Sequence, residues 1–200
     1  MTQIFTILFD LDGTLVDTAP ALMDAHNHVM KKFNLHRKDL KDIKDEKIKK
    51  EMLKEFIDHY SKNIDKKSKP IAGVVDFLKW AKSKNISMGI CTNKQERLAV
   101  DLLKKINLFD FFEYIAGSDT FAFNKPDPRH LTDVVEIIGG DLKKTIMVGD
   151  SEVDSLSASN AKIPFVLIEN GYTEKSSKEI PHDILIKDFL GFEKIIKKYL

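Results

Sequence analysis

Short apolar segments alternate with amphipathic helical patterns along most of the chain, and this alternation limits the possible folds more than any other feature. The apolar segments end at turn-forming or polar residues, as buried strands do; they are Ile4–Phe9, Ile86–Cys91, Tyr114–Ala116, Thr145–Val148, Pro164–Ile168 and, as a sixth candidate, Ile184–Ile186. Apolar residues recur at helical spacing in 74–81, 98–106 and 131–138. Such alternation is typical of a parallel sheet covered by helices. We therefore predict an α/β fold with a Rossmann-like parallel sheet.

One interval departs from this alternation. More than seventy residues separate the first predicted strand from the second, whereas a simple crossover needs far fewer. Two apolar helical stripes lie inside the interval; they consist of Leu22, His26, Val29, Met30 and Phe33, and of Ile48, Met52, Phe56 and Tyr60. We expect a small helical subdomain at residues 18–70, inserted into a main domain of residues 1–17 and 71–200.

Size and composition limit the class of protein. Two hundred residues with 42% hydrophobic content suit one main domain with a buried core and exclude a large multidomain protein. No segment approaches the roughly 18 uninterrupted apolar residues of a membrane span, and residues 1–10 lack the features of an export signal. We expect a cytoplasmic protein without a membrane partner. The single cysteine, Cys91, ends a predicted strand and is interpreted as a buried structural residue.

The net charge of +1 argues against nucleic-acid binding as the function of the whole chain. The charge is unevenly distributed, because residues 31–69 hold fourteen lysines and arginines against eight acidic residues. That segment is therefore +6 and the remainder is −5. A solvated helical surface is the simpler interpretation of the segment, and steering of an anionic substrate is the alternative.

The segment Phe9–Leu15 brings two carboxylates, Asp10 and Asp12, to the end of an apolar strand and then turns at Gly13. The two-residue period of a strand places both acids on the same side. Neighbouring carboxylates repel each other, so a cation or a shared proton is expected beside them. Alone, such a pair would more often be a turn, because Asp and Gly are ordinary turn residues.

A second acidic segment strengthens the interpretation. It again follows an apolar strand and contains Asp150 and Asp154 after Gly149, a residue type that allows close backbone approach. If the first and fourth strands are neighbours at a topological switch point, Asp10 and Asp150 converge in the crevice where α/β sheets bind ligands. Several hard oxygen ligands that meet there suit Mg²⁺.

These acids would repel a phosphate unless cations and hydrogen-bond donors offset them. Thr92 and Asn93 follow the second strand and offer a hydroxyl, an amide and backbone N–H groups at the start of a helix, where anions bind well. Lys125 lies in a loop stiffened by Pro126 and Pro128, as a fixed positive charge requires. Each feature is weak alone, since Thr-Asn pairs commonly cap helices and loop lysines are commonly solvated.

The order of these four motifs, each at or just beyond the carboxyl end of a predicted strand, resembles the haloacid dehalogenase superfamily. The resemblance covers nearly the whole chain, and it is greatest to the branch with a helical cap after the first motif and to phosphoglycolate phosphatases. It implies that residues 1–17 and 71–200 form a haloacid dehalogenase-like catalytic core, with residues 18–70 as a reduced helical cap. It also implies a magnesium-dependent phosphatase whose partner is a small-molecule phosphate ester.

The resemblance further implies a role for each site residue. Asp10 would be the nucleophile that forms an aspartyl phosphate, and Asp12 would be the general acid and base. Thr92 and Lys125 would hold the phosphoryl group, with Asn93 beside them. The implied metal ligands are Asp10, the backbone carbonyl of Asp12 and Asp150, with Asp154 supporting the metal site.

The insertion limits the choice of substrate. At about fifty residues it is shorter than the cap that the resemblance leads us to expect, and it lacks a glycine-containing substrate loop. Phosphoglycolate is the leading substrate, and a different small phosphate ester is the alternative. Asp12 argues against carbon–halogen cleavage, because dehalogenases of the superfamily lack an acid at that position.

Two other functions stay open. One is a sugar phosphomutase with a cap, which a short cap disfavours because a mutase must exclude water. The other is a non-catalytic regulatory module that retains the fold, and the presence of all four charged motif residues disfavours it. No sequence feature indicates an oligomeric state.

Overall fold

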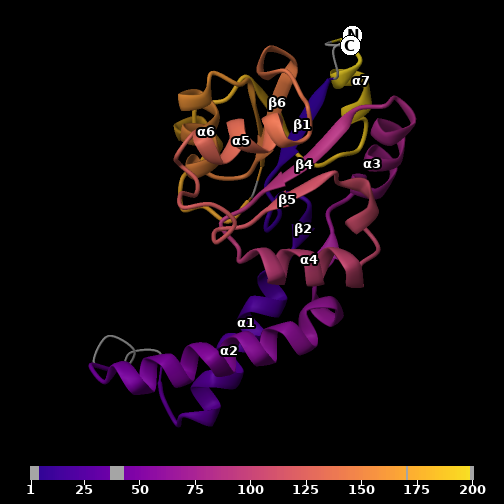
Figure 1. Ribbon diagram of the computed structural model, residues 1–200. Helices are drawn as coiled ribbons and strands as arrows, with labels where there is room; N and C mark the ends of the chain where they lie inside the picture. The colour runs from indigo at the N-terminus through magenta and orange to yellow at the C-terminus, as the bar shows by residue number, and fades with distance from the viewer. Residues whose placement is uncertain (1–4, 37–42, 170, 199–200) are drawn as a thin grey trace. The chain divides into compact units, whose positions relative to one another are not determined.

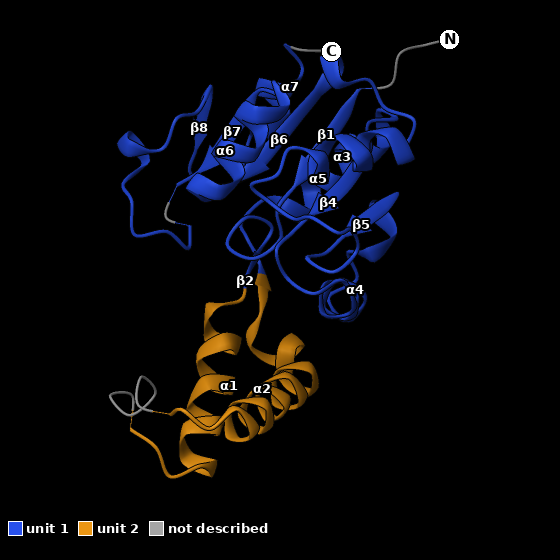
Figure 2. Cartoon of the chain, turned by 60° about the vertical axis from the view of Figure 1, so that its left-hand side comes forward, with its two compact units in different colours: residues 1–17, 70–200 blue, residues 18–69 orange. Residues whose placement is uncertain are grey.

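The computed structural model describes residues 5–36, 43–169 and 171–198. The chain divides into two compact units, a main unit of residues 1–17 and 70–200 and an inserted unit of residues 18–69 (Figure 2). Among the described residues, no helix combines the length and the apolar character that crossing a bilayer requires.

The main unit contains a six-stranded sheet in the order β5-β4-β1-β6-β7-β8. The strands are β1 (Thr6–Phe9), β4 (Ser87–Cys91), β5 (Tyr114–Ala116), β6 (Thr145–Gly149), β7 (Phe165–Ile168) and β8 (Ile184–Ile186). Every neighbouring pair is parallel, so the predicted α/β fold with a Rossmann-like parallel sheet is confirmed. Ile4, where the first strand was predicted to begin, lies outside the described residues.

The strand order creates a topological switch point at β1. From β1 the chain goes to β4 and β5 on one side, and it then returns to β6 on the other side. The register of β1 and β6 joins Thr6 to Thr145 and Phe9 to Val148. The predicted first and fourth strands are therefore neighbours, and the residues that follow them leave the sheet at the same edge.

Helices cover both faces of this sheet, with α5 and α6 on one face and α3 and α7 on the other (Figure 1). The helices of the main unit are α3 (Val74–Ser83), α4 (Glu96–Lys105), α5 (Arg129–Ile137), α6 (Glu152–Ala161) and α7 (Phe192–Ile196), with short 3₁₀ turns η2 (Phe109–Phe111), η3 (Leu142–Lys144) and η4 (Ser177–Glu179).

Consecutive side chains of β1 point to opposite faces of the sheet, because side chains alternate along a strand. Leu8 packs in a buried cluster that includes Leu131 and Val134 of α5. Phe9 points the other way, and its ring lies 6.3 Å from that of Phe77 in α3 and 6.2 Å from that of Phe189. This two-sided burial holds β1 rigidly and fixes the position of the residue that follows it.

The inserted unit consists of α1 (Ala19–Lys32) and α2 (Glu46–Lys67). The short strands β2 (Val16–Asp17) and β3 (Lys69–Pro70) pair with each other where the chain enters and leaves it. The rings of His28 and His59 stack between the helices, 3.9 Å apart. All lysines of α2 are exposed, as expected for a solvated helical surface.

The predicted stripes of this unit are only partly correct. The fully buried residues of α1 are Ala21, Ala25 and Val29, and those of α2 are Tyr60 and Ile64. Ile48, predicted to face inward, is 38% exposed. Val29 belongs to the predicted stripe, but the other two buried residues of α1 are alanines, which stand out less in a sequence than larger apolar residues.

Candidate active site

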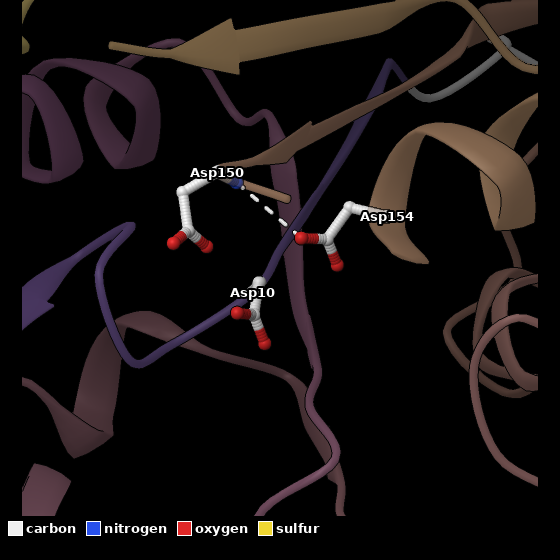
Figure 3. A group of neighbouring side chains, drawn as sticks. All are labelled: Asp10, Asp150 and Asp154. Atoms are coloured by element: carbon white, nitrogen blue, oxygen red, sulfur yellow. Dashed lines mark hydrogen bonds between the residues drawn. The ribbon is translucent and has the colours of Figure 1, made fainter. Parts of the chain in front are cut away.

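Three carboxylates from separate segments meet at the carboxyl edge of the sheet. Asp10 follows β1, Asp150 follows β6, and Asp154 lies in the first turn of α6. Each offers an oxygen atom within 4.8 Å of the others (Figure 3). The convergence of Asp10 and Asp150 results directly from the pairing of β1 with β6.

Asp154 is held by the loop before its own helix. Its Oδ2 accepts hydrogen bonds from the backbone N–H groups of Asp150 and Ser151, at 3.3 and 3.2 Å, and from Ser151 Oγ at 2.6 Å. The Ser151 side chain in turn accepts from the Asp154 N–H, which completes a capping box. The helix start thus fixes the Asp154 carboxylate in a single orientation.

Asp150 is held by two distant segments. Its Oδ1 accepts from Thr14 Oγ1 at 3.0 Å, and its Oδ2 accepts from the Tyr172 N–H at 2.6 Å. Gly171 makes the second contact possible, because a Cβ atom built there would lie 2.1 Å from the Asp150 Cβ. Gly13 has φ of +80°, a conformation that favours glycine, and it turns the chain past the same carboxylate.

Lys125 supplies positive charge to the centre of this group. Its buried Nζ donates to Oδ1 of Asp10 at 2.8 Å and to Oδ1 of Asp154 at 2.6 Å. Its backbone is fixed as well, since its N–H donates to His130 Nδ1 at 3.2 Å and its carbonyl accepts from Asn93 Nδ2 at 2.9 Å. The ammonium is therefore positioned by contacts from the turn after β4, from α5 and from the acids themselves.

The charge balance of the group favours a further cation. Burial raises the pKa of Asp10 to about 7 against the opposing effect of Lys125, and the Asp154 and Asp150 carboxylates add to the rise. Burial, followed by the charge of Asp154, likewise raises the pKa of Asp150 to about 6. Burial lowers the pKa of Lys125, but the two carboxylates outweigh it and raise that pKa above its usual range. One ammonium does not fully compensate three buried acids.

These residues fit a hard divalent metal ion. The three carboxylates offer oxygen atoms, which Mg²⁺ prefers. Burial raises the pKa values of Asp10 and Asp150, and a bound cation would favour their ionised forms. Asp10 and Asp150 could bind such an ion. The Asp154 carboxylate is already occupied by four hydrogen bonds from protein groups, which suits a supporting role.

The turn after β4 connects the remaining predicted site residues. Thr92 is buried, and its Oγ1 accepts a hydrogen bond from the Lys94 N–H at 3.2 Å. Asn93 uses its amide to hold the Lys125 carbonyl. Asp12 is bound by Lys94, whose Nζ lies 2.8 Å from each carboxylate oxygen.

The structure therefore brings Asp10, Asp150, Asp154 and Lys125 into one group and links Asn93 to it through the Lys125 backbone. Thr92 and Asp12 are joined to each other through Lys94. Cys91 is fully buried within the core, as predicted.

Several supporting residues were not assigned from the sequence. Thr14 binds Asp150 from 136 residues away in the sequence, and Tyr172 binds it from 22 residues away. Lys94 is separated from its partner Asp12 by 82 residues. No local pattern signals such contacts. His130 is wholly buried, and its contact with the Lys125 N–H has no signal in the sequence either.

A parallel α/β sheet with three carboxylates and a buried lysine at its switch point defines a Rossmann-like α/β protein with a candidate centre for a hard metal ion. The sequence comparison identifies the family. The profile described as haloacid dehalogenase-like hydrolase matches residues 7–168, and the chain belongs to this family.

Named relatives agree with this assignment. A phosphoglycolate phosphatase of Mesorhizobium japonicum is 38% identical, over 92% of this chain and 90% of its own. A phosphoglycolate phosphatase of Agrobacterium fabrum is 35% identical, over 96% and 94%. The family and the phosphatase class predicted from the sequence are confirmed.

A solved structure shows the same fold. A crystal structure from Haemophilus somnus, described as that of a predicted phosphoglycolate phosphatase, has a TM-score of 0.89 at 24% identity. The match covers 98% of this chain and 99% of the other.

Proposed function

We propose that this chain is a magnesium-dependent phosphatase that hydrolyses a small phosphate monoester through a covalent intermediate on Asp10. The observation that carries the proposal is the position of Asp10 among Lys125, Asp150 and Asp154 at the switch point of the sheet. A carboxylate nucleophile divides a difficult hydrolysis into two easier steps.

In the first step, a carboxylate oxygen of Asp10 attacks phosphorus, and the bond from phosphorus to the leaving oxygen breaks. Asp12 gives a proton to that oxygen, so an alcohol leaves. In the second step, water attacks the phosphorus of the aspartyl phosphate while Asp12 takes a proton from the water. The bond from phosphorus to Asp10 then breaks, which releases phosphate and restores the carboxylate.

Positive charge is the main requirement of phosphoryl transfer, because negative charge spreads over the phosphoryl oxygens. Lys125 is fixed beside Asp10 and supplies part of that charge. Asp10, Asp150 and the backbone carbonyl of Asp12 would hold Mg²⁺, with Asp154 in support. The bound ion would supply further charge stabilisation to the phosphoryl group.

The phosphoryl group would lie at the turn after β4. Thr92 offers a hydroxyl there, and its oxygen already accepts from the Lys94 N–H, which orients it. Asn93 would contribute less directly, because its amide holds the Lys125 carbonyl.

Phosphoglycolate is the leading substrate. The support for it is the name shared by the relatives from Mesorhizobium japonicum and Agrobacterium fabrum. The inserted unit has no glycine within residues 18–69, and a panel of small phosphate esters is therefore needed to rank phosphoglycolate against others.

An assay of hydrolysis tests the proposal. We expect turnover of an aryl phosphate with Mg²⁺, loss of turnover with EDTA, and loss of at least roughly 10³-fold in kcat for Asp10→Asn, since that variant lacks the nucleophile. Asp110→Asn, an exposed site on η2, is the matched control and should retain full activity.

Two outcomes would contradict the proposal. Absence of metal-dependent turnover on the aryl ester and on the whole panel would exclude a phosphatase. Conversion of a sugar phosphate to its isomer without release of inorganic phosphate would favour the phosphomutase alternative. Among active esters, kcat/KM decides whether phosphoglycolate is preferred.

A further inference from the structure

Lys94 is a buried cation directed at Asp12 rather than at the three-carboxylate centre. Its side chain is 7% exposed, and its Nζ lies 2.8 Å from both Oδ1 and Oδ2 of Asp12. Asp12 itself is 19% exposed at its side chain. Because one ammonium contacts both oxygens, the carboxylate cannot rotate about its Cβ–Cγ bond without losing a contact.

The backbone of Lys94 is fixed on two sides. Its N–H donates to Thr92 Oγ1 at 3.2 Å, and its carbonyl accepts from the Ser118 N–H at 2.9 Å. Gly117 allows the second segment to approach, since a Cβ there would lie 2.7 Å from the Lys94 carbonyl oxygen. The side chain therefore extends toward Asp12 from a rigid base.

Stability alone is a weak explanation for this arrangement. Burying an ammonium and ordering a long side chain both cost free energy, and a buried ion pair often adds little net stability. What the pair does provide is a defined direction for the Asp12 carboxylate.

We propose that Lys94 is a positioning residue that directs the Asp12 carboxylate toward the leaving oxygen of the substrate; this rests on the proposed phosphatase function. Lys94 acts through Asp12 and forms no bond to the reacting phosphorus. Its contribution is then largest where transfer of a proton to the leaving group matters most.

The leaving group provides the test. A dinitrophenolate leaves with little need of a proton, whereas an alkoxide needs one in the transition state. The value of kcat/KM reports the steps up to formation of the aspartyl phosphate. Lys94→Met should therefore lower kcat/KM by roughly 10²-fold for an alkyl phosphate such as glycerol phosphate, and by less than about 3-fold for dinitrophenyl phosphate.

Further readouts separate positioning from damage to the fold. For the alkyl ester we expect the loss in kcat with little change in KM, because Lys94 does not hold the phosphoryl group. Lys143→Met, at an exposed lysine, is the matched control and should leave both esters unchanged. In an Asp12→Asn background, Lys94→Met should cause little further loss, since the carboxylate that it orients is absent.

Chemical rescue covers the case in which Lys94→Met folds poorly. In Lys94→Cys the shortened side chain vacates the space that the lysine fills beside Asp12 and gives the reagent room to reach the new thiol, whereas the only native thiol, Cys91, is fully buried in the core. Aminoethylation of the variant creates an ammonium of nearly the original length, and it should restore most of the activity on the alkyl ester.

The outcomes are distinguishable. Equal losses on both esters, or unchanged activity on the alkyl ester, would overturn the role of Lys94 while the phosphatase function stands. Failure of rescue in a folded, modified protein would also overturn it. Absence of turnover in the wild-type protein would overturn both proposals.

Discussion

Lys125 and Asp150 each make two polar contacts within the site. Lys125 binds Asp10 and Asp154 with one ammonium, so it positions the proposed nucleophile and also reduces the repulsion between acids. Asp150 accepts one hydrogen bond at each oxygen, which fixes its carboxylate before any metal ion arrives. Such preorganisation lowers the cost of assembling the site around a ligand.

The first prediction concerns the pH dependence of metal binding. The ordinary pKa of an aspartate is 3.8, and it is raised to about 7 for Asp10 and about 6 for Asp150. Between pH values of about 4 and 7, the folded metal-free protein thus binds more protons at these groups than the unfolded chain does. Their contribution to stability therefore falls as the pH rises through this window.

The proposed Mg²⁺ would bind the ionised carboxylates and would compete with these protons. At a fixed Mg²⁺ concentration near 100 times its Kd at pH 8, we expect Tm to rise by roughly 5–10 °C at pH 8 and by about 2 °C or less at pH 5.5. Scanning calorimetry with and without Mg²⁺ at both pH values measures the difference. Asp150→Asn should abolish most of the shift, and equal shifts at the two pH values would refute the expectation.

Whole elements were predictable to different degrees. The strands could be predicted from the sequence, because a buried parallel strand is a short apolar run that ends at turn residues. The first predicted residue of β7, Pro164, lies just before the strand, and it has no N–H to donate to a ladder. Helix α6 was not predicted, because its buried residues are Asp154, Ser155, Ser157 and Ala158, which form no apolar stripe.

The candidate site was likewise predictable only in part. Asp10 and Asp150 could be placed together from the sequence, because strand ends in a parallel sheet share an edge. The segment from 171 onward could not, since its contact with Asp150 depends on the path of a loop after β7. Loops of this kind have no periodicity from which a partner can be inferred.

The second prediction tests that loop. Alanine at position 171 would bring a methyl group 2.1 Å from the Asp150 Cβ, so either the loop or the carboxylate must move. We expect Gly171→Ala to weaken Mg²⁺ binding by roughly 10–100-fold, the usual effect of losing a group that orients a metal ligand. The Mg²⁺ concentration for half-maximal activity measures this change.

Gly139→Ala is the control, because a methyl group added at position 139 meets open space, while the φ of +70° there makes the substitution strained in its own backbone. It should lower the free energy of unfolding by about 1 kcal/mol through backbone strain and leave Mg²⁺ activation unchanged. If Gly171→Ala alters only stability, the loop does not position Asp150.

At the scale of the molecule, all residues assigned to chemistry belong to one unit. Asp10, Asp12, Lys94, Lys125 and Asp150 lie within residues 1–17 and 70–200, as does the whole six-stranded sheet. The inserted unit has its own buried contact between α1 and α2. The paired strands β2 and β3 bring the two ends of the insertion together.

The third prediction follows from this separation. Replacing residues 18–69 by a short Gly-Ser turn between Asp17 and Pro70 should leave a protein that unfolds cooperatively and retains its Mg²⁺-dependent rise in Tm. Aryl phosphate hydrolysis should persist, because each proposed catalytic group remains. Circular dichroism, calorimetry and the aryl phosphate assay test these points, and a collapsed or metal-insensitive product would show that the main unit depends on the insertion.

The paired strands at the base of the insertion also bear on how such a protein can diversify. Sequence drift, recombination or a laboratory library confined to residues 18–69 changes no atom of the main sheet or of the acids at its edge. Selection can therefore sample new inserted segments without first repairing the chemistry. The part of the gene that encodes residues 18–69 can therefore be exchanged as one segment, while selection continues to preserve the part that encodes the main unit.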